Sequence, residues 1–179
     1  MIMKRLVKAT GIQQTICMAI IETLAVLCFS IPMAMADSPA IFSTWVGFEV
    51  DKCASIWLIK TYINPDAEIR FYNKDDKNIE GLLFDTPTAK FRRYFNMSTY
   101  ESLIKHYEIK DPALGYIGKI IHDIEINTWE KKVLPETIEV RDAVNKIIWE
   151  TKGNTEVVKK SNQYFNFLYK HISKQYIMP

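Results

Sequence analysis

The segment Val50–Phe71 constrains the fold most, because it holds a helix start, an apolar helix face and a strand in close succession. Asp51 is placed to cap the helix, since its carboxylate can accept a backbone N–H from the first turn. Apolar side chains then recur at helical spacing, which predicts one buried face: Cys53, Trp57, Leu58, Tyr62 and Ile63. Asn64-Pro65 ends the helix, because the residue before a proline is disfavoured in α geometry. Glu68–Tyr72 alternates polar and apolar residues, which predicts a half-buried strand.

Further strands are expected on both sides of this segment. Trp45–Val50 is predicted to form a short strand that leads into the helix. Leu82–Phe84 is a second candidate, which Asp85-Thr-Pro87 ends. Ala89–Phe95 is a third, in which Phe91 and Phe95 flank a basic pair.

From Ser98 onward the sequence indicates helices. Ser98-Thr-Tyr-Glu101 has the pattern of a capping box, and Asp111-Pro112 places aspartate at N-cap with proline at the first helical position. Further helices are expected from Pro135 and from Thr155, after the break at Gly153-Asn154. The predicted class is therefore α+β in a single domain, with a small sheet in the first half and a helix-rich second half.

The first 36 residues have the pattern of a secretory signal peptide. Lys4, Arg5 and Lys8 precede an apolar run, and Ala34-Met35-Ala36 supplies small residues at a cleavage site. We therefore expect residues 1–36 to be a signal, residues 37–46 a leader segment and residues 47–179 the folded domain. Cleavage near Ala36 would place the protein in the periplasm or outside the cell. The alternative is an uncleaved N-terminal anchor.

Composition excludes some classes of function. The chain has a formal charge of +2, but the signal holds three of its 23 basic and one of its 21 acidic residues, which leaves 20 of each. A neutral domain does not favour nucleic-acid binding, which needs a basic face. No membrane span is expected after cleavage. Cys53 is the one cysteine outside the signal, so neither an internal disulfide nor a cysteine-rich zinc site is possible there.

One candidate cluster lies near the end of the helix that follows Asp111. His122 and Glu125 are three residues apart on a helix and share a face, so they can form a metal pair or an acid/base pair. Asp123 points about 100° away from His122 around the axis. The alternative role for His122 is a favourable interaction with the helix C-terminus.

Other candidates lie before this helix. Asp85 is either a ligand carboxylate at a strand end or a turn former. Lys90, Arg92 and Arg93 can hold an oxyanion through charge-assisted hydrogen bonds, although a solvated strand face explains them equally well. The spacing of Cys53 to Trp57 places its thiol on the buried face, where it would be inert, so Asp51-Lys52 is the better candidate pair.

The order of these blocks resembles the chromate-resistance family that contains the ChrB-type domain, including its exported branch. The resemblance extends from about Gly47 to Ile148, and the blocks that carry it are Asp51-Lys-Cys-Ala-Ser-Ile-Trp-Leu-Ile-Lys60, Ile63-Asn-Pro-Asp-Ala-Glu68, Phe84-Asp-Thr-Pro87, Ser98-Thr-Tyr-Glu101, Asp111-Pro-Ala-Leu114 and Ile121-His-Asp-Ile-Glu125. Matching positions of the family pattern are Asp51, Trp57, Asp85, Glu101, His122 and Asp123. Where relatives usually show a histidine, a glycine and a cysteine before the capping box, this chain has Arg93, Phe95 and Ser98.

The resemblance implies a role in chromate resistance but no established reaction, cofactor or metal. Our first hypothesis is an exported protein that binds or senses chromate or another small oxyanion. It predicts that Lys52, Arg93 and His122 converge on one pocket with few competing carboxylates. The alternative is a metal-dependent or acid/base enzyme that uses Asp51, Asp85, His122 and Glu125. A third option is a protein retained for interaction, in which these residues are caps and core.

Overall fold

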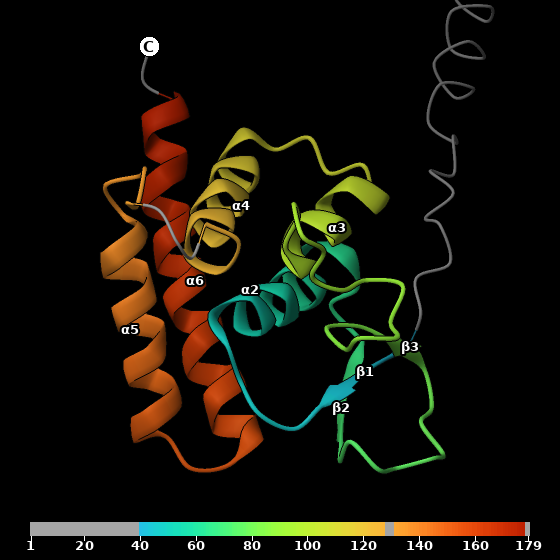
Figure 1. Cartoon of the computed structure of the whole chain (residues 1–179). Helices are drawn as coiled ribbons and strands as arrows, with labels where there is room; N and C mark the ends of the chain where they lie inside the picture. Colours follow the sequence, from blue (N-terminus) through green and yellow to red (C-terminus); the bar gives the residue numbers. More distant parts are fainter. Residues whose placement is uncertain (1–39, 128–130, 178–179) are drawn as a thin grey trace, which may run out of the picture. The chain divides into compact units, whose positions relative to one another are not determined.

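A small parallel sheet forms from the first elements of the chain (Figure 1). The structure, a computed structural model, describes residues 40–127 and 131–177. Strand β1 (Ile41–Trp45) lies between β2 (Glu68–Tyr72) and β3 (Leu82–Leu83), and both neighbours run parallel to it. Because β1 is the central strand, its residues Phe42, Ser43 and Thr44 are buried.

Two of the expected strands differ from the structure. The strand predicted at Trp45–Val50 lies instead at Ile41–Trp45, within the segment that we assigned to the leader. The strand predicted at Ala89–Phe95 is wrong, because in this segment the described chain makes only isolated bridges, Phe84 to Phe91 and Tyr94 to Met97. The strand predicted at Glu68–Tyr72 is confirmed with the same bounds.

Helix α2 (Val50–Leu58) follows β1 after a short loop and is buried along its whole length. It continues into η1 (Ile59–Ile63), a turn of π-helix that ends when Asn64 adopts extended geometry with φ −150°. The end before Pro65 is thus confirmed. The π turn shifts the register of hydrogen bonding, so that Asn64 N–H donates to Ile59 O at 2.8 Å.

Four further helices complete the described chain: α3 (Thr99–His106), α4 (Pro112–Glu125), α5 (Thr137–Glu150) and α6 (Asn154–Ile177). The capping box at the start of α3 is confirmed, with Ser98 and Glu101 exchanging side-chain and backbone hydrogen bonds. Asp111 caps α4 as predicted, accepting from Ala113 N and Leu114 N. Helix α5 begins at Thr137 rather than at Pro135.

The helices pack together around α2. Helices α3, α4, α5 and α6 all contact it, and Figure 1 shows α2 between the sheet and the α4–α6 layer. Trp57 is fully buried and stacks on Phe165 of α6 with ring centroids 5.5 Å apart. The molecule is therefore α+β with a helix-rich second half, as the sequence predicts, in one compact unit that contains the described residues.

The expected signal, residues 1–36, lies outside the described residues. Within residues 40–127 and 131–177, no helix is long and apolar enough to cross a membrane.

Candidate functional site

Asp51 does not cap its own helix, as the sequence led us to expect. Helix α2 starts one residue earlier, with Glu49 at the N-cap position. The Asp51 carboxylate, which is fully buried, instead accepts hydrogen bonds from the backbone of α3: Thr99 N–H at 2.7 Å and Tyr100 N–H at 2.9 Å. Asp51 therefore joins two helix N-termini that are far apart in the sequence.

This contact helps to provide hydrogen-bond acceptors for the backbone N–H groups in the first turn of α3. The first four N–H groups of a helix have no partner within the helix. In α3, Asp51 accepts Thr99 N–H and Tyr100 N–H, the Ser98 hydroxyl accepts Glu101 N–H at 3.1 Å, and Glu101 Oε2 accepts the N-cap Ser98 N–H at 2.8 Å. An acidic group at this position is also favoured by the helix dipole. The position of Asp51 is thus fixed by the backbone of α3.

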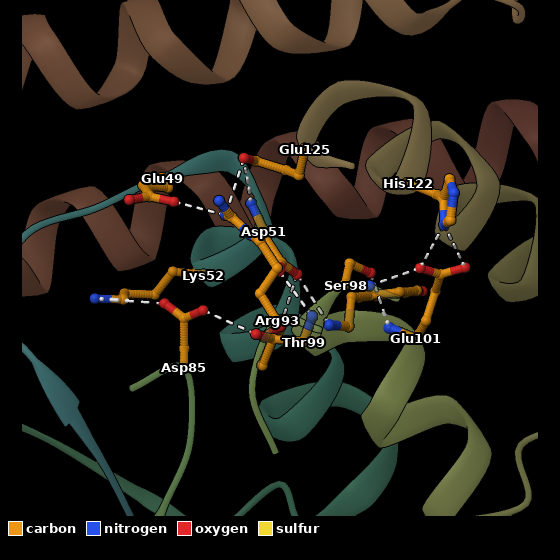
Figure 2. Close-up of polar contacts among 12 residues, drawn as sticks. Glu49, Asp51, Lys52, Asp85, Arg93, Ser98, Thr99, Glu101, His122 and Glu125 are labelled. Carbon is orange, nitrogen blue, oxygen red and sulfur yellow. Dashed lines mark hydrogen bonds and ion pairs between the residues drawn. The ribbon is translucent and has the colours of Figure 1, made fainter. Parts of the chain in front are cut away.

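Arg93, in the loop that follows β3, joins three carboxylates from two other segments (Figure 2). Its Nη2 lies 2.6 Å from Glu49 Oε2 and 2.9 Å from Glu125 Oε2, and its Nε lies 3.9 Å from Asp51 Oδ2. Glu125, at the end of α4, also accepts from Asp51 N–H at 3.2 Å. The Arg93 guanidinium therefore ties its own loop to the start of α2 and to the end of α4.

Lys52 and Asp85 form a second, adjacent pair. Lys52 Nζ lies 3.5 Å from Asp85 Oδ2 and donates to the carbonyl oxygens of Trp45 and Gly47, each at 2.8 Å. Asp85 also accepts from the Thr99 hydroxyl at 2.8 Å. Since an ammonium has three donors, the protein itself uses the hydrogen-bonding capacity of Lys52. Asp85 has φ +50°, an uncommon geometry for a residue other than glycine.

Burial raises the pKa values of these carboxylates, and repulsion between them adds to the effect. Burial, and then the nearby charge of Asp85, raise the pKa of Asp51 to about 7, although the two backbone N–H groups oppose the shift. Burial also raises the pKa of Asp85, against the effect of Lys52, and the pKa of Glu125, against the effect of Arg93. Burial lowers the pKa of Arg93, but Glu125 and Glu49 outweigh it, so that this guanidinium stays charged.

A pocket of about 580 Å³ opens beside these pairs, between the β1–α2 loop and the loop after β3. Its wall contains four basic residues, Lys52, Lys74, Arg92 and Arg93, and two acidic ones, Glu49 and Asp85. Trp45, Phe48 and Pro87 provide apolar surface. We call this space the Arg93 pocket. Its wall carries more positive than negative charge.

His122 does not reach this pocket. Its Nδ1 lies 2.9 Å from Glu101 Oε2, and Figure 2 shows the ring directed to Glu101 and not to Glu125. The expected pairing of His122 with Glu125 is therefore wrong, as is the convergence of His122 with Lys52 and Arg93. The two side chains have different partners: the His122 ring contacts Glu101 of α3, whereas Arg93 and Asp51 N–H bind the Glu125 carboxylate.

Asp123 has a structural role between α4 and α5. Its carboxylate accepts from Val133 N, Leu134 N, the Thr137 hydroxyl and the Asn127 amide. Burial opposes its ionisation, but these hydrogen bonds outweigh that effect and lower its pKa to about 2. Asp123 thus fixes the start of α5 and is not part of the Arg93 pocket.

The basic patch that the sequence suggested is divided. Arg92 and Arg93 line the Arg93 pocket, whereas Lys90 lies over Phe91 and lines a separate hollow with Lys105 and His106. Cys53 is buried, and burial raises the pKa of its thiol to about 12, which keeps it protonated. Among residues 40–127 and 131–177, no three His, Cys, Asp or Glu side chains are grouped so as to hold a metal ion.

Sequence reasoning missed Glu49 and Thr99. Glu49 is the outer partner of Arg93, and Thr99 binds both Asp51 and Asp85. The signal for Glu49 was its position just before α2, where an acidic residue is favoured. Thr99 lies within the capping box, in which only the side chains of Ser98 and Glu101 were expected to form hydrogen bonds.

Comparison with known proteins gives one family. The family model described as "ChrB, C-terminal domain" matches residues 42–172 of this chain. Neither the curated proteins nor the solved structures contain a significant match.

Proposed function

The chain belongs to the family of the ChrB C-terminal domain, and we propose that it binds a small oxyanion, with chromate as the first candidate, in the Arg93 pocket. Membership in this family supports a role in chromate resistance. Oxyanion binding is the finer proposal, and the observation that carries it is the excess of basic residues on the pocket wall.

The donors for such a ligand are on the loop after β3 and on the segment after β2. Lys52 is committed to two carbonyls and to Asp85, so it contributes charge rather than hydrogen bonds. Arg92 and Arg93 supply planar guanidinium groups, which match the geometry of oxyanions. Lys74 adds a further cation, held 5.5 Å from the centre of the Trp45 ring.

Thr86 adds a polar group to the wall. Its hydroxyl is buried and, among the described residues, has no hydrogen-bond partner. A buried polar group without a partner is costly, and a ligand or water in the adjacent pocket would satisfy it. This supports a pocket built for a polar occupant.

The direct test is calorimetric titration of the purified chain with sodium chromate and, separately, with sodium sulfate. We expect saturable binding of at least one of them at millimolar concentration or below. Arg92→Gln removes a donor without touching the contacts of Arg93 to Asp51 and Glu125, and should weaken binding at least about tenfold. Arg141→Gln, on an exposed face of α5, is the matched control and should leave binding unchanged. Absence of saturable binding of both anions would reject the proposal.

Acid/base catalysis is the second candidate function, and the geometry favours only part of the expected set. Asp85 lines the Arg93 pocket and its pKa is raised, which suits a proton donor. Asp51 is fully buried with backbone N–H groups on both carboxylate oxygens, and His122 faces Glu101. A reaction in this pocket would therefore depend on Asp85 and not on the full set.

We further propose export of the protein, with cleavage near Ala36. The support is the basic, apolar and small-residue order of residues 1–36. Intact-mass measurement of the protein recovered from the native host tests this. A mature chain that starts near Asp37 is expected, and a mass that includes residues 1–36 would contradict cleavage.

A further inference from the structure

Glu49 occupies a position on Arg93 that an anionic ligand would otherwise take. Its carboxylate lies 2.6 Å from Arg93 Nη2 and forms part of the Arg93 pocket wall. The same nitrogen also contacts Glu125, so that two carboxylates share one side of the guanidinium. Figure 2 shows Glu49 and Glu125 approaching Arg93 from different elements.

The two carboxylates differ in how firmly they are held. The Glu125 side chain is 13% exposed and also accepts from Asp51 N–H, whereas the Glu49 side chain is 60% exposed. An exposed ion pair contributes little free energy, because water screens it and because its side chains lose entropy. Glu49 can therefore leave Arg93 at small cost, whereas Glu125 stays.

We propose that Glu49 is an internal competitor for the oxyanion, which displaces its carboxylate from Arg93 on binding. This inference rests on the proposed function and names the residue that limits affinity at the same pocket. When Glu49 leaves, Glu125 and Asp51 still hold the guanidinium in place, so the ligand meets an arginine that is already positioned. A ligand with two negative charges replaces a carboxylate with one, which favours dianions over monoanions.

Removal of the charge on residue 49 should therefore strengthen binding. If the ligand binds only the fraction of molecules in which Glu49 has left Arg93, the apparent affinity is reduced by that fraction. Glu49→Gln keeps the length of the side chain but loses the charge, so the competing state is weakened. We expect chromate and sulfate to bind about three- to tenfold more tightly to this variant. Because that fraction is the same for every anion, nitrate should gain affinity by a similar factor.

Glu80→Gln is the matched control. Glu80 is another exposed glutamate in an ion pair with an arginine, Arg70, but it does not line the Arg93 pocket. Its substitution should leave the dissociation constants for chromate, sulfate and nitrate unchanged. Thermal unfolding of both variants separates a binding effect from a change in stability.

The outcomes separate this inference from the proposed function. Tighter dianion binding by Glu49→Gln and not by Glu80→Gln supports the competitor role. Binding by the wild-type chain with equal or weaker binding by Glu49→Gln overturns the competitor role and leaves oxyanion binding standing. If neither the wild-type chain nor Glu49→Gln binds an anion, the competitor role and the proposed function are both overturned. Binding by Glu49→Gln alone supports the competitor role and rejects binding by the native pocket.

Discussion

Asp51 shows how one side chain can organise a site from the inside. It is fully buried, yet its carboxylate accepts the first two N–H groups of α3 and lies near the Arg93 guanidinium. The sequence predicted that it caps its own helix, whereas in the structure it accepts the N–H groups of another helix, α3. Which helix it caps could not be predicted, because that depends on how α3 packs against α2.

Removal of this carboxylate should destabilise the fold strongly. Asp51→Ala leaves Thr99 N–H and Tyr100 N–H buried without partners, and each such group costs about 1–3 kcal/mol. We expect the free energy of unfolding in urea to fall by about 3 kcal/mol or more. Asp75→Ala, in the exposed loop after β2, is the control and should change stability very little. Similar unfolding midpoints for the two variants would contradict the structural role of Asp51.

The pKa shifts predict an unusual dependence of stability on pH. Burial raises the pKa of Asp51 to about 7, so between about pH 4 and pH 7 the folded chain holds a proton that the unfolded chain has released. The contribution of Asp51 to the free energy of unfolding is therefore fully present below about pH 4 and is lost as the pH rises through 7. Asp85 and Glu125, whose pKa values are also raised, act in the same direction.

Asp123 acts in the opposite direction and at lower pH. Its folded pKa of about 2 is below the unfolded value, so its contribution is present above about pH 4 and is lost as the pH falls to 2. Urea unfolding measured at intervals from pH 2 to pH 8 should thus give maximum stability near pH 4–5. Stability that increases from pH 5 to pH 7 would show that Asp51 and its neighbours are already ionised in the folded chain.

At the scale of helices and strands, the sequence correctly predicted the features that depend on residues close together in the chain. The capping box of α3, the helix end before Pro65 and the strand Glu68–Tyr72 all lie within a few residues of the signals that specify them. Strand β1 was misplaced because Ser43 and Thr44 are small polar residues that its central position nevertheless buries. A strand was expected at Ala89–Phe95 because Phe91 and Phe95 flank a basic pair, but apart from the bridges of Phe91 to Phe84 and of Tyr94 to Met97 this segment follows an irregular path.

Two glycines offer a matched test of how β3 docks on β1. Gly81 has φ +83°, and an added Cβ would lie 2.5 Å from Ile41 O, which is backbone. Gly115, in α4, has open space around the corresponding position. We expect Gly81→Ala to cost more than about 1 kcal/mol of stability and Gly115→Ala to add about 0.5–1 kcal/mol. Chemical unfolding of both variants checks this, and equal effects would contradict the close approach of β1 to residue 81.

At the scale of the whole molecule, the candidate site forms where three distant segments meet. The start of α2, the loop after β3 and the end of α4 bring Glu49, Arg93 and Glu125 together. The sequence identified Asp51, Lys52, Asp85, Arg93 and Glu125 as candidates, and these five do gather. It also grouped His122 and Asp123 with them, because adjacency in sequence does not show which neighbouring element each side chain of α4 faces.

The central claim, that an oxyanion binds beside Arg93, is tested most directly by locating the bound chromium. Crystals of the chain soaked in chromate would give an anomalous difference map at the chromium absorption edge. We predict a peak in the Arg93 pocket, next to the guanidinium groups of Arg92 and Arg93, with the Glu49 carboxylate turned away from Nη2. A peak only in the hollow of Lys90, Lys105 and His106, or no ordered chromium in the protein, would contradict the account.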